Sequence, residues 1–290
     1  MIPSRRRLLP IASATIIAVA GLLVCAWLAW QWAYAREIAR QTAQARQQMS
    51  LHAQSLEQLV GRYRALPQLL ALDPQLRDAL QGPVDAATRD QLNRRLEQAS
   101  LTTRAATLTL INASGIAVAA SNWRDPTSNV GENYGFRPYV QQAMHEGEGR
   151  FYGVGVTTGL PGYYMSRAMR GDHGTSIGVI VIKIGLGALG DDWLRGPDTV
   201  FVSDDNGVAF LAGDDNWRYR MLRPLDPKTR AQLEATRQYP PQLLRPLLAR
   251  TLRTLDDGTR VRALLEPRQP GQWLALDMPL PEPGWTLHLL

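Results

Sequence analysis

The most conspicuous hydrophobic segment of the chain is an uncharged run of 25 residues, 11–35. As a helix, this run is long enough to cross the hydrocarbon core of a bilayer, which is about 30 Å thick. Arginines precede it at 5–7 and tryptophans gather at its far end, as at a membrane interface. The pattern predicts a transmembrane helix over 11–35, with 1–10 in the cytoplasm and everything later outside. A cleaved signal peptide is the alternative, but the apolar run is too long for one, and tryptophans stand where small residues should permit cleavage.

Residues 36–104 carry a helical pattern. Good helix formers dominate 36–64, and apolar residues recur there every three or four positions, so that one side of a long helix can pack against another surface. A second helical stretch covers 66–80, and a third begins after the Gly82-Pro83 break with Asp85 as its N-cap. The pattern predicts a stalk helix that leaves the membrane and carries a small helical bundle.

After residue 104 the pattern changes to short β-prone runs. It predicts strands over 106–111 and 115–120, a helix that Pro138 opens and Gly147 ends, and three strands within 150–185. This order is typical of an α+β sensor-like sheet of antiparallel strands with one face covered. A weaker copy follows over 197–290. The predicted fold class is α+β: a long N-terminal transmembrane and stalk helix, then two sheet lobes over 105–196 and 197–290.

The net charge of +6 comes almost entirely from arginine, because Lys183 and Lys228 are the only lysines. The arginines are scattered and form no dense stripe on a predicted helix, which argues against a nucleic-acid partner. A location next to a membrane explains the positive net charge better than a nucleic-acid partner does. The basic excess within 217–268 fits either a lobe close to lipid or a solvated face of an arginine-rich protein. The single cysteine, Cys25, excludes a disulfide framework and a thiolate metal site.

No catalytic or metal-binding constellation is visible in the sequence. The run 185–190 reads GLGALG, but Gly196-Pro197 leaves no room for the full helix that a dinucleotide site needs. The four histidines show no metal-ligand spacing, and no phosphate-binding loop or hydrolase motif occurs. We therefore expect no enzyme active site and no metal site in this chain.

Candidate chemistry gathers in the stretch 131–166, which holds a Phe-Arg-Pro-Tyr run, a Thr-Thr-Gly turn and five tyrosines: Tyr134, Tyr139, Tyr152, Tyr163 and Tyr164. Tyrosine offers a rigid apolar body with a hydroxyl at its tip, which suits a small, partly polar ligand enclosed by protein. The alternative is that these side chains cover a sheet and keep their hydroxyls in water.

Two cationic side chains restrict the class of ligand that the site could bind. Arg137 lies inside the aromatic run, and Lys183 shares a face of its strand with apolar residues. Between 133 and 170 the only acids are Glu146 and Glu148, both in a glycine-bounded turn. An anionic ligand would supply the missing charge, with Arg137 as a bidentate fork and Lys183 as a point charge. The remaining hydrogen bonds would come from the tyrosine hydroxyls and from Thr157, Thr158, Gly159 and Ser166. The alternatives are that the lysine reaches solvent and that the arginine pairs with a distant acid.

Several ordered motifs resemble the periplasmic region of the C4-dicarboxylate sensor histidine kinases of the DctB family: SNW at 121–123, VGENYGFRPY at 130–139, GRFYGVGVTTGLPGYYMS at 149–166, GVIVIK at 178–183 and WRYRML at 217–222. The resemblance implies two stacked PAS-like lobes, called a double Cache fold, whose membrane-distal lobe, 105–196, binds succinate, fumarate or malate. It places six residues in pocket motifs: Arg137, Tyr139, Thr157, Thr158, Ser166 and Lys183. Tyr134, Tyr152 and Gly159 are second-rank candidates.

The same resemblance implies a sensor in the periplasm of a bacterial inner membrane that forms a homodimer through its stalk. Such kinases continue through a second membrane helix to an ATP-binding domain, so ATP and Mg²⁺ belong there, and a response regulator and a dicarboxylate transporter are partners of the full-length protein. This chain ends at Leu290, as a fragment or a truncated gene product, and no cofactor is expected in it. One alternative is the same module in a chemoreceptor or cyclic-nucleotide enzyme that reads another carboxylate. The other is an anchored extracytoplasmic enzyme or scaffold.

Overall fold

A computed structural model of the chain describes residues 8–256, 258–264 and 271–290. It divides into two compact units, Met1–Ser50 and Leu51–Leu290. Helix α1 (Leu8–Tyr63) contains the predicted membrane segment 11–35. Residues 1–7, for which the sequence predicts a cytoplasmic location, lie outside the described residues. Among the described residues, one helical stretch, Ala18–Ala71, contains a segment that is apolar and long enough to cross a membrane.

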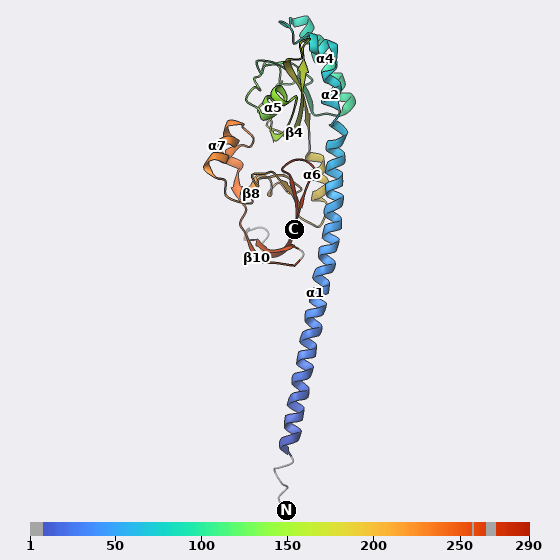
Figure 1. The fold of residues 1–290 in the computed structure, drawn as a ribbon, viewed down its shortest axis with the longest axis vertical. Helices are drawn as coiled ribbons and strands as arrows, with labels where there is room; N and C mark the ends of the chain where they lie inside the picture. Colours follow the sequence, from blue (N-terminus) through green and yellow to red (C-terminus); the bar gives the residue numbers. More distant parts are fainter. Residues whose placement is uncertain (1–7, 257, 265–270) are drawn as a thin grey trace, which may run out of the picture. The chain divides into compact units, whose positions relative to one another are not determined.

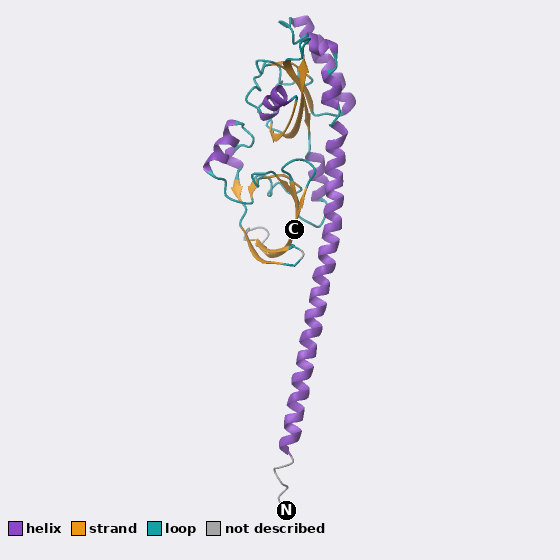
Figure 2. Ribbon diagram, in the orientation of Figure 1, coloured by secondary structure: helices purple, strands orange, loops and turns teal. Residues whose placement is uncertain are grey.

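The first lobe is built on a five-stranded antiparallel sheet in the order β2-β1-β5-β4-β3 (Figures 1 and 2). Its strands are β1 (Thr107–Asn112), β2 (Ala117–Ala120), β3 (Glu148–Val154), β4 (Pro161–Arg170) and β5 (Ser176–Ile184). The helix predicted between the second and third strands is α5 (Pro138–Glu146), which ends at Gly147 in a left-handed conformation. The α+β prediction and the order of elements in this lobe are confirmed.

Helices cover both faces of this sheet, which is more than the single covered face that the sequence predicts. Helix α5 packs on β3, β4 and β5, whereas α2 (Leu66–Ala71) contacts β4 and β5 from the other side and α4 (Ala86–Thr103) contacts β1 and β2 (Figure 1). The short helix α3 (Pro74–Asp78) links them. Asp85 is the N-cap of α4, and its carboxylate accepts a hydrogen bond from the Thr88 backbone at 2.7 Å. The additional cover comes from the predicted bundle.

The second lobe follows α6 (Gly187–Leu194) and contains a six-stranded sheet in the order β10-β11-β12-β13-β6-β7. Its strands are β6 (Val200–Ser203), β7 (Ala209–Ala212), β10 (Ala249–Thr254), β11 (Arg260–Leu264), β12 (Gly271–Pro279) and β13 (Thr286–Leu289). Between β7 and β10 the chain forms a two-strand parallel ribbon, β8 (Arg220–Met221) with β9 (Arg245–Pro246), and the helix α7 (Pro227–Ala235). Because residues 51–290 form one compact unit, the boundary between 196 and 197 stays a prediction.

The two lobes meet through aromatic side chains. Tyr152 and Tyr163 on the first sheet contact Trp285, which precedes β13, and Tyr152 also packs on Phe210 of β7 with 4.1 Å between ring centroids. The Tyr152 hydroxyl donates a 2.9 Å hydrogen bond to the Phe210 carbonyl. Through this contact, the part of the first sheet that carries Tyr152 and Tyr163 lies against the second lobe.

Candidate functional site

The register of three neighbouring strands assembles a row of polar side chains on one face of the first sheet. Lys183 of β5 lies opposite Thr107 of β1 on one side and opposite Tyr164 of β4 on the other. Side chains at directly paired positions point to the same face of a sheet. The next row on this face holds Thr109, Val181 and Ser166. Strand pairing therefore brings together residues that are far apart in the sequence.

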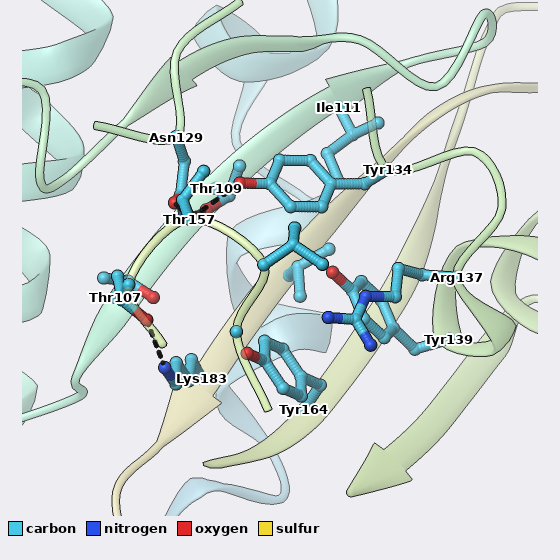
Figure 3. A pocket seen from close by; sticks show the side chains of 14 residues that line it. Thr107, Thr109, Ile111, Asn129, Tyr134, Arg137, Tyr139, Thr157, Tyr164 and Lys183 are labelled. Atoms are coloured by element: carbon cyan, nitrogen blue, oxygen red, sulfur yellow. Dashed lines mark hydrogen bonds between the residues drawn. The ribbon is translucent and has the colours of Figure 1, made fainter. Parts of the chain in front are cut away.

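This face forms the floor of a cavity of about 20 Å³, and the unfilled space in and around it, open solvent included, is about 400 Å³. Helix α5, the residues before it and the loop after β3 supply the walls (Figure 3). The side chains that line it include two cations and no carboxylate among the described residues: Thr107, Thr109, Ile111, Asn129, Tyr134, Arg137, Tyr139, Gly155, Val156, Thr157, Thr158, Tyr164, Val181 and Lys183. The cavity is much smaller than a typical ligand pocket, so a small molecule enters it only if lining side chains move.

The ammonium group of Lys183 is buried without an acidic partner. The residue is 6% exposed, and its Nζ donates to Thr158 Oγ1 at 3.1 Å and to the Leu160 carbonyl at 2.8 Å. Among the described residues, no carboxylate forms an ion pair with it. Burial, together with the positive charge of Arg137, lowers the pKa of Lys183 from 10.5 to about 8. At neutral pH the lysine is thus a charged donor in a site that disfavours its charge.

Arg137 is the second buried cation, at 1% exposure. It occupies the N-cap position of α5, between the rings of Phe136 and Phe151. Its Nη1 donates to two backbone carbonyls of the second lobe at 3.1 Å each, and its Nη2 donates to the Val154 carbonyl. Its Nε is buried and has no acceptor among the described residues. Burial lowers the pKa of Arg137, and all its acceptors are neutral, so its charge is not compensated either.

Tyrosines supply protonated hydroxyl groups to the cavity. Tyr139 stacks on Tyr164 with 4.8 Å between ring centroids and an interplanar angle of 2°. The hydroxyl of Tyr134 lies 3.3 Å from Thr157 Oγ1. Burial raises the pKa of each of the three phenols. They therefore stay protonated at neutral pH and can donate hydrogen bonds to an anion.

Eight lining residues are not among the predicted site residues, and three of these are polar side chains outside the stretch 131–166: Thr107, Thr109 and Asn129. The Asn129 amide connects both sides of the cavity, because its Nδ2 donates to Thr109 Oγ1 at 3.0 Å and its Oδ1 accepts from Thr157 Oγ1 at 2.9 Å. The alternation of threonine and leucine in β1 was a usable signal, since it places both threonines on one face. Asn129 lies in an irregular segment, where no periodicity indicates its direction.

Glycine at position 155 lets the loop after β3 close on the polar groups. A Cβ atom there would lie 2.5 Å from Thr158 Oγ1 and 3.1 Å from Lys183 Nζ. The first distance is shorter than side chains tolerate, so alanine at this position would displace Thr158 or the lysine head. The close approach of backbone at Gly155 is part of how the cavity is built.

The structure brings six of the nine predicted site residues to the cavity: Tyr134, Arg137, Tyr139, Thr157, Thr158 and Lys183. The other three lie outside its lining. Ser166 is on the correct face but lies beneath α5, where its hydroxyl contacts the carbonyls of Tyr139 and Gly149. Tyr152 points to the second lobe, and Gly159 forms the turn of the loop with a positive φ of 66°.

Comparison with known proteins gives extensive similarity to one kind of sensor. The chain is 34% identical over 280 residues to the C4-dicarboxylate transport sensor protein DctB of Rhizobium meliloti (strain 1021), a match that covers 96% of this chain and 44% of that protein. It is 33% identical over 256 residues to the protein of the same name from Pseudomonas aeruginosa (strain PAO1), covering 88% of this chain and 38% of the relative. The chain thus spans less than half the length of these relatives. No protein-family model matches it.

A solved structure shares the fold. The sensor domain of the V. cholerae histidine kinase DctB superposes with a TM-score of 0.77 at 25% sequence identity, covering 88% of this chain and 97% of that domain. The resemblance noted in the sequence is confirmed.

Proposed function

Because the chain belongs to the DctB family of sensor proteins, we propose that it senses a C4-dicarboxylate, which binds in the cavity between β1, β4, β5 and α5. One observation carries the proposal: two buried cations, Arg137 and Lys183, line one cavity that contains no carboxylate among the described residues. A buried charge without a partner is costly, and a ligand with opposite charge removes that cost.

The chemistry of the cavity suits a short diacid. Each cation can meet one carboxylate, Lys183 through its ammonium and Arg137 through its guanidinium. The protonated phenols of Tyr134, Tyr139 and Tyr164 supply neutral donors. The apolar side chains of Ile111, Val156 and Val181 offer contact to a hydrocarbon chain between the two charged ends. The Nε of Arg137 has no acceptor among the described residues, and a contact of a carboxylate with both Nη atoms would displace the carbonyls that they now hold.

The setting of this site follows from the same family membership. We propose that α1 anchors the chain in the inner membrane of a bacterium, with the cavity on the periplasmic side. The arginines at 5–7, ahead of the apolar run, support this orientation. In a longer protein the sensor would control a histidine kinase that uses ATP and Mg²⁺, acts as a homodimer and passes its signal to a response regulator.

Titration of the full chain with succinate tests the proposal. The protein is reconstituted in lipid nanodiscs, and binding is measured by isothermal titration calorimetry. Saturable heat is expected for the unaltered chain, and none for Arg137→Ala. Arg167→Ala is the matched control, because that arginine lies on β4 of the same sheet and pairs with Glu148 at the surface. The proposal is wrong if succinate, fumarate and malate all give no heat, or if Arg137→Ala binds as the unaltered chain does.

A further inference from the structure

Arg137 serves two parts of the chain at once. It lines the cavity of the first lobe, yet its Nη1 donates to the carbonyls of Thr236 and Arg237, 99 and 100 residues further along the chain. These carbonyls directly follow α7 (Pro227–Ala235), at the end of a helix where carbonyl groups lack intrahelical partners. The guanidinium therefore caps the C-terminus of α7, where positive charge is favourable.

Residues 236–239, which we name the α7 tail, connect the two lobes. On one side, the Gln238 carbonyl accepts a 2.9 Å hydrogen bond from the backbone of Val154, at the end of β3 next to the cavity. On the other side, the buried Tyr239 donates its hydroxyl to Asp204 Oδ2 at 2.9 Å, in the turn between β6 and β7. The tail thus lies between the cavity and the second sheet.

A bound carboxylate would compete with the α7 tail for Arg137. All present acceptors of the guanidinium are neutral carbonyls, and hydrogen bonds to a charged acceptor are roughly twice as strong. The tail can give up the arginine, because Thr236 is partly exposed and Arg237 is exposed, so that water can take the place of the guanidinium at their carbonyls. Arg237 also has a φ of 49°, a left-handed conformation that is unfavourable for a residue other than glycine or asparagine.

We propose that Arg137 is a shared donor that couples the cavity to the second lobe. Without an anion it holds the α7 tail, and a carboxylate in the cavity withdraws it, so that residues 236–239 loosen from the first lobe. This inference rests on the proposed function, since it requires an anionic ligand in the cavity. By linkage, whatever holds the tail in place weakens anion binding to the same extent as the anion weakens the tail.

The cap can be tested without any ligand. Hydrogen–deuterium exchange of the full chain in nanodiscs is followed by mass spectrometry over residues 227–239. Arg137→Gln is expected to raise exchange there by about fivefold, the effect of losing one to two hydrogen bonds, whereas the surface variant Arg167→Gln leaves it unchanged. Arg137→Lys, which keeps the positive charge but loses the planar fork, is the second variant in case Arg137→Gln does not fold, and it is expected to raise exchange in the same segment. Unchanged exchange in the variant that folds would overturn the cap.

The coupling is tested by adding succinate. Saturating succinate is expected to raise exchange over 227–239 in the unaltered chain. Tyr239→Phe, which weakens the attachment of the tail, is expected to bind succinate about threefold to fivefold more tightly, as the loss of one hydrogen bond implies. Tyr219→Phe removes the hydroxyl of a neighbouring tyrosine ring and is the control, with unchanged affinity.

The outcomes separate this inference from the proposed function. If succinate binds but exchange over 227–239 stays the same or falls, the coupling is wrong while the dicarboxylate site stands. If succinate does not bind, the proposed function and the ligand-driven release both fail, and the ligand-free comparison still decides whether Arg137 caps α7. Faster exchange in Arg137→Gln together with ligand-induced exchange in the unaltered chain supports the coupling.

Discussion

Two buried groups of charges in this molecule differ in how they are neutralised. Near the contact between the lobes, the carboxylate of Glu282 is 5% exposed and is surrounded by groups from the turn after α1, from β3 and from β4. It pairs with Arg64 at 2.7 Å and Arg150 at 3.5 Å, and the Tyr163 hydroxyl donates to it at 2.5 Å. In the cavity, Lys183 and Arg137 have no acidic partner among the described residues. The first group is neutralised by residues of the chain, whereas the second has no acidic group of its own among the described residues.

The difference shows how one tyrosine-rich stretch contributes side chains both to the cavity and to the contact around Glu282. Neighbouring residues on a strand point to opposite faces. Tyr164 therefore faces the cavity, and Tyr163, the residue before it, faces Glu282 and Trp285. A similar division separates Phe151, beside Arg137, from Tyr152, which contacts the second lobe. Aromatic density alone marks the stretch, but strand alternation assigns each ring to a binding or a structural site.

The largest effect is expected from Lys183→Met, which removes one uncompensated cation. Succinate binding should weaken by at least about 100-fold, the usual cost of deleting one partner of a buried charge pair. At the same time the ligand-free protein should become more stable, because the pKa of Lys183 shows that its charge opposes folding. Calorimetry and thermal unfolding measure the two effects, with Lys228→Met as control. A loss of stability in Lys183→Met would contradict the difference between the unpaired cations of the cavity and the paired charges around Glu282.

Glu282→Ala should have the opposite pattern. The substitution leaves the Tyr163 hydroxyl buried without its acceptor and removes the partner of two arginines. Because both arginines are partly exposed, the expected loss is about 2–3 kcal/mol of unfolding free energy rather than the full cost of a broken buried pair. Urea denaturation checks this value. Glu148→Ala, which removes an exposed carboxylate, should cost less than about 0.5 kcal/mol. Strong loss of succinate binding in folded Glu282→Ala would show that the two groups are not separate.

The depressed pKa of Lys183 predicts how binding depends on pH. In the ligand-free protein the ammonium loses its proton near pH 8, whereas an anion favours the charged form. Succinate affinity should therefore be constant below that pH and fall by about tenfold per unit above it, until the pKa of the complex is reached. Titrations from pH 6.5 to 9.5 measure this slope. Lys183→Arg stays charged throughout this range, so its succinate affinity should not change with pH. An affinity of the unaltered chain that does not change with pH would mean that the lysine does not contact the ligand.

The same titration affects stability without ligand. The pKa of Lys183 is about 8 in the folded state and 10.5 in its unperturbed form. Between these values the unfolded chain binds more protons than the folded one, so the contribution of Lys183 to stability rises with pH. The unfolding midpoint of the unaltered chain should increase relative to Lys183→Met across this window. A difference that does not change with pH would contradict the assignment.

The smallest effects are expected from the two adjacent tyrosines. Tyr163→Phe removes one hydrogen bond to a buried carboxylate that keeps its two arginines, and should lower stability by about 1.5 kcal/mol with unchanged affinity. Tyr164→Phe removes a donor from the cavity and should weaken succinate binding by about fivefold with little change in stability. The pair is matched in chemistry and differs only in the face of β4. Equal effects on affinity would break the assignment of rings to faces.

Much of the first lobe could be predicted because its hydrophobic pattern is regular. The alternation in β5 places Lys183 on one face with Val181 and Val179, and the Pro138 start and Gly147 end bound α5. The second lobe was harder. Strand β10 (Ala249–Thr254) is exposed along its length and rich in arginine, so its sequence does not show the pattern of a half-buried strand.

Residues of the candidate site could be predicted where the alternation of a strand determines which way a side chain points. They could not be predicted where contacts with distant parts of the chain determine its surroundings. Ser166 has the correct alternation, yet α5 covers it, and no local signal shows where a helix will lie. The acceptors of Arg137 are backbone carbonyls about 100 residues away, which side-chain chemistry does not encode. The scarcity of acids, by contrast, is a property of composition, and the sequence alone therefore favours an anionic ligand.

The most direct measurement compares succinate with succinamide, in which both carboxylates are neutral amides of nearly the same shape. Calorimetric titration of the full chain in nanodiscs with each compound asks whether the cavity requires negative charge. If Arg137 and Lys183 await two carboxylates, succinate binds with one equivalent per chain and at least about 100-fold more tightly than the diamide. Equal affinities for the two compounds, or heat from the diamide alone, would contradict the conclusion that the ligand neutralises these two cations.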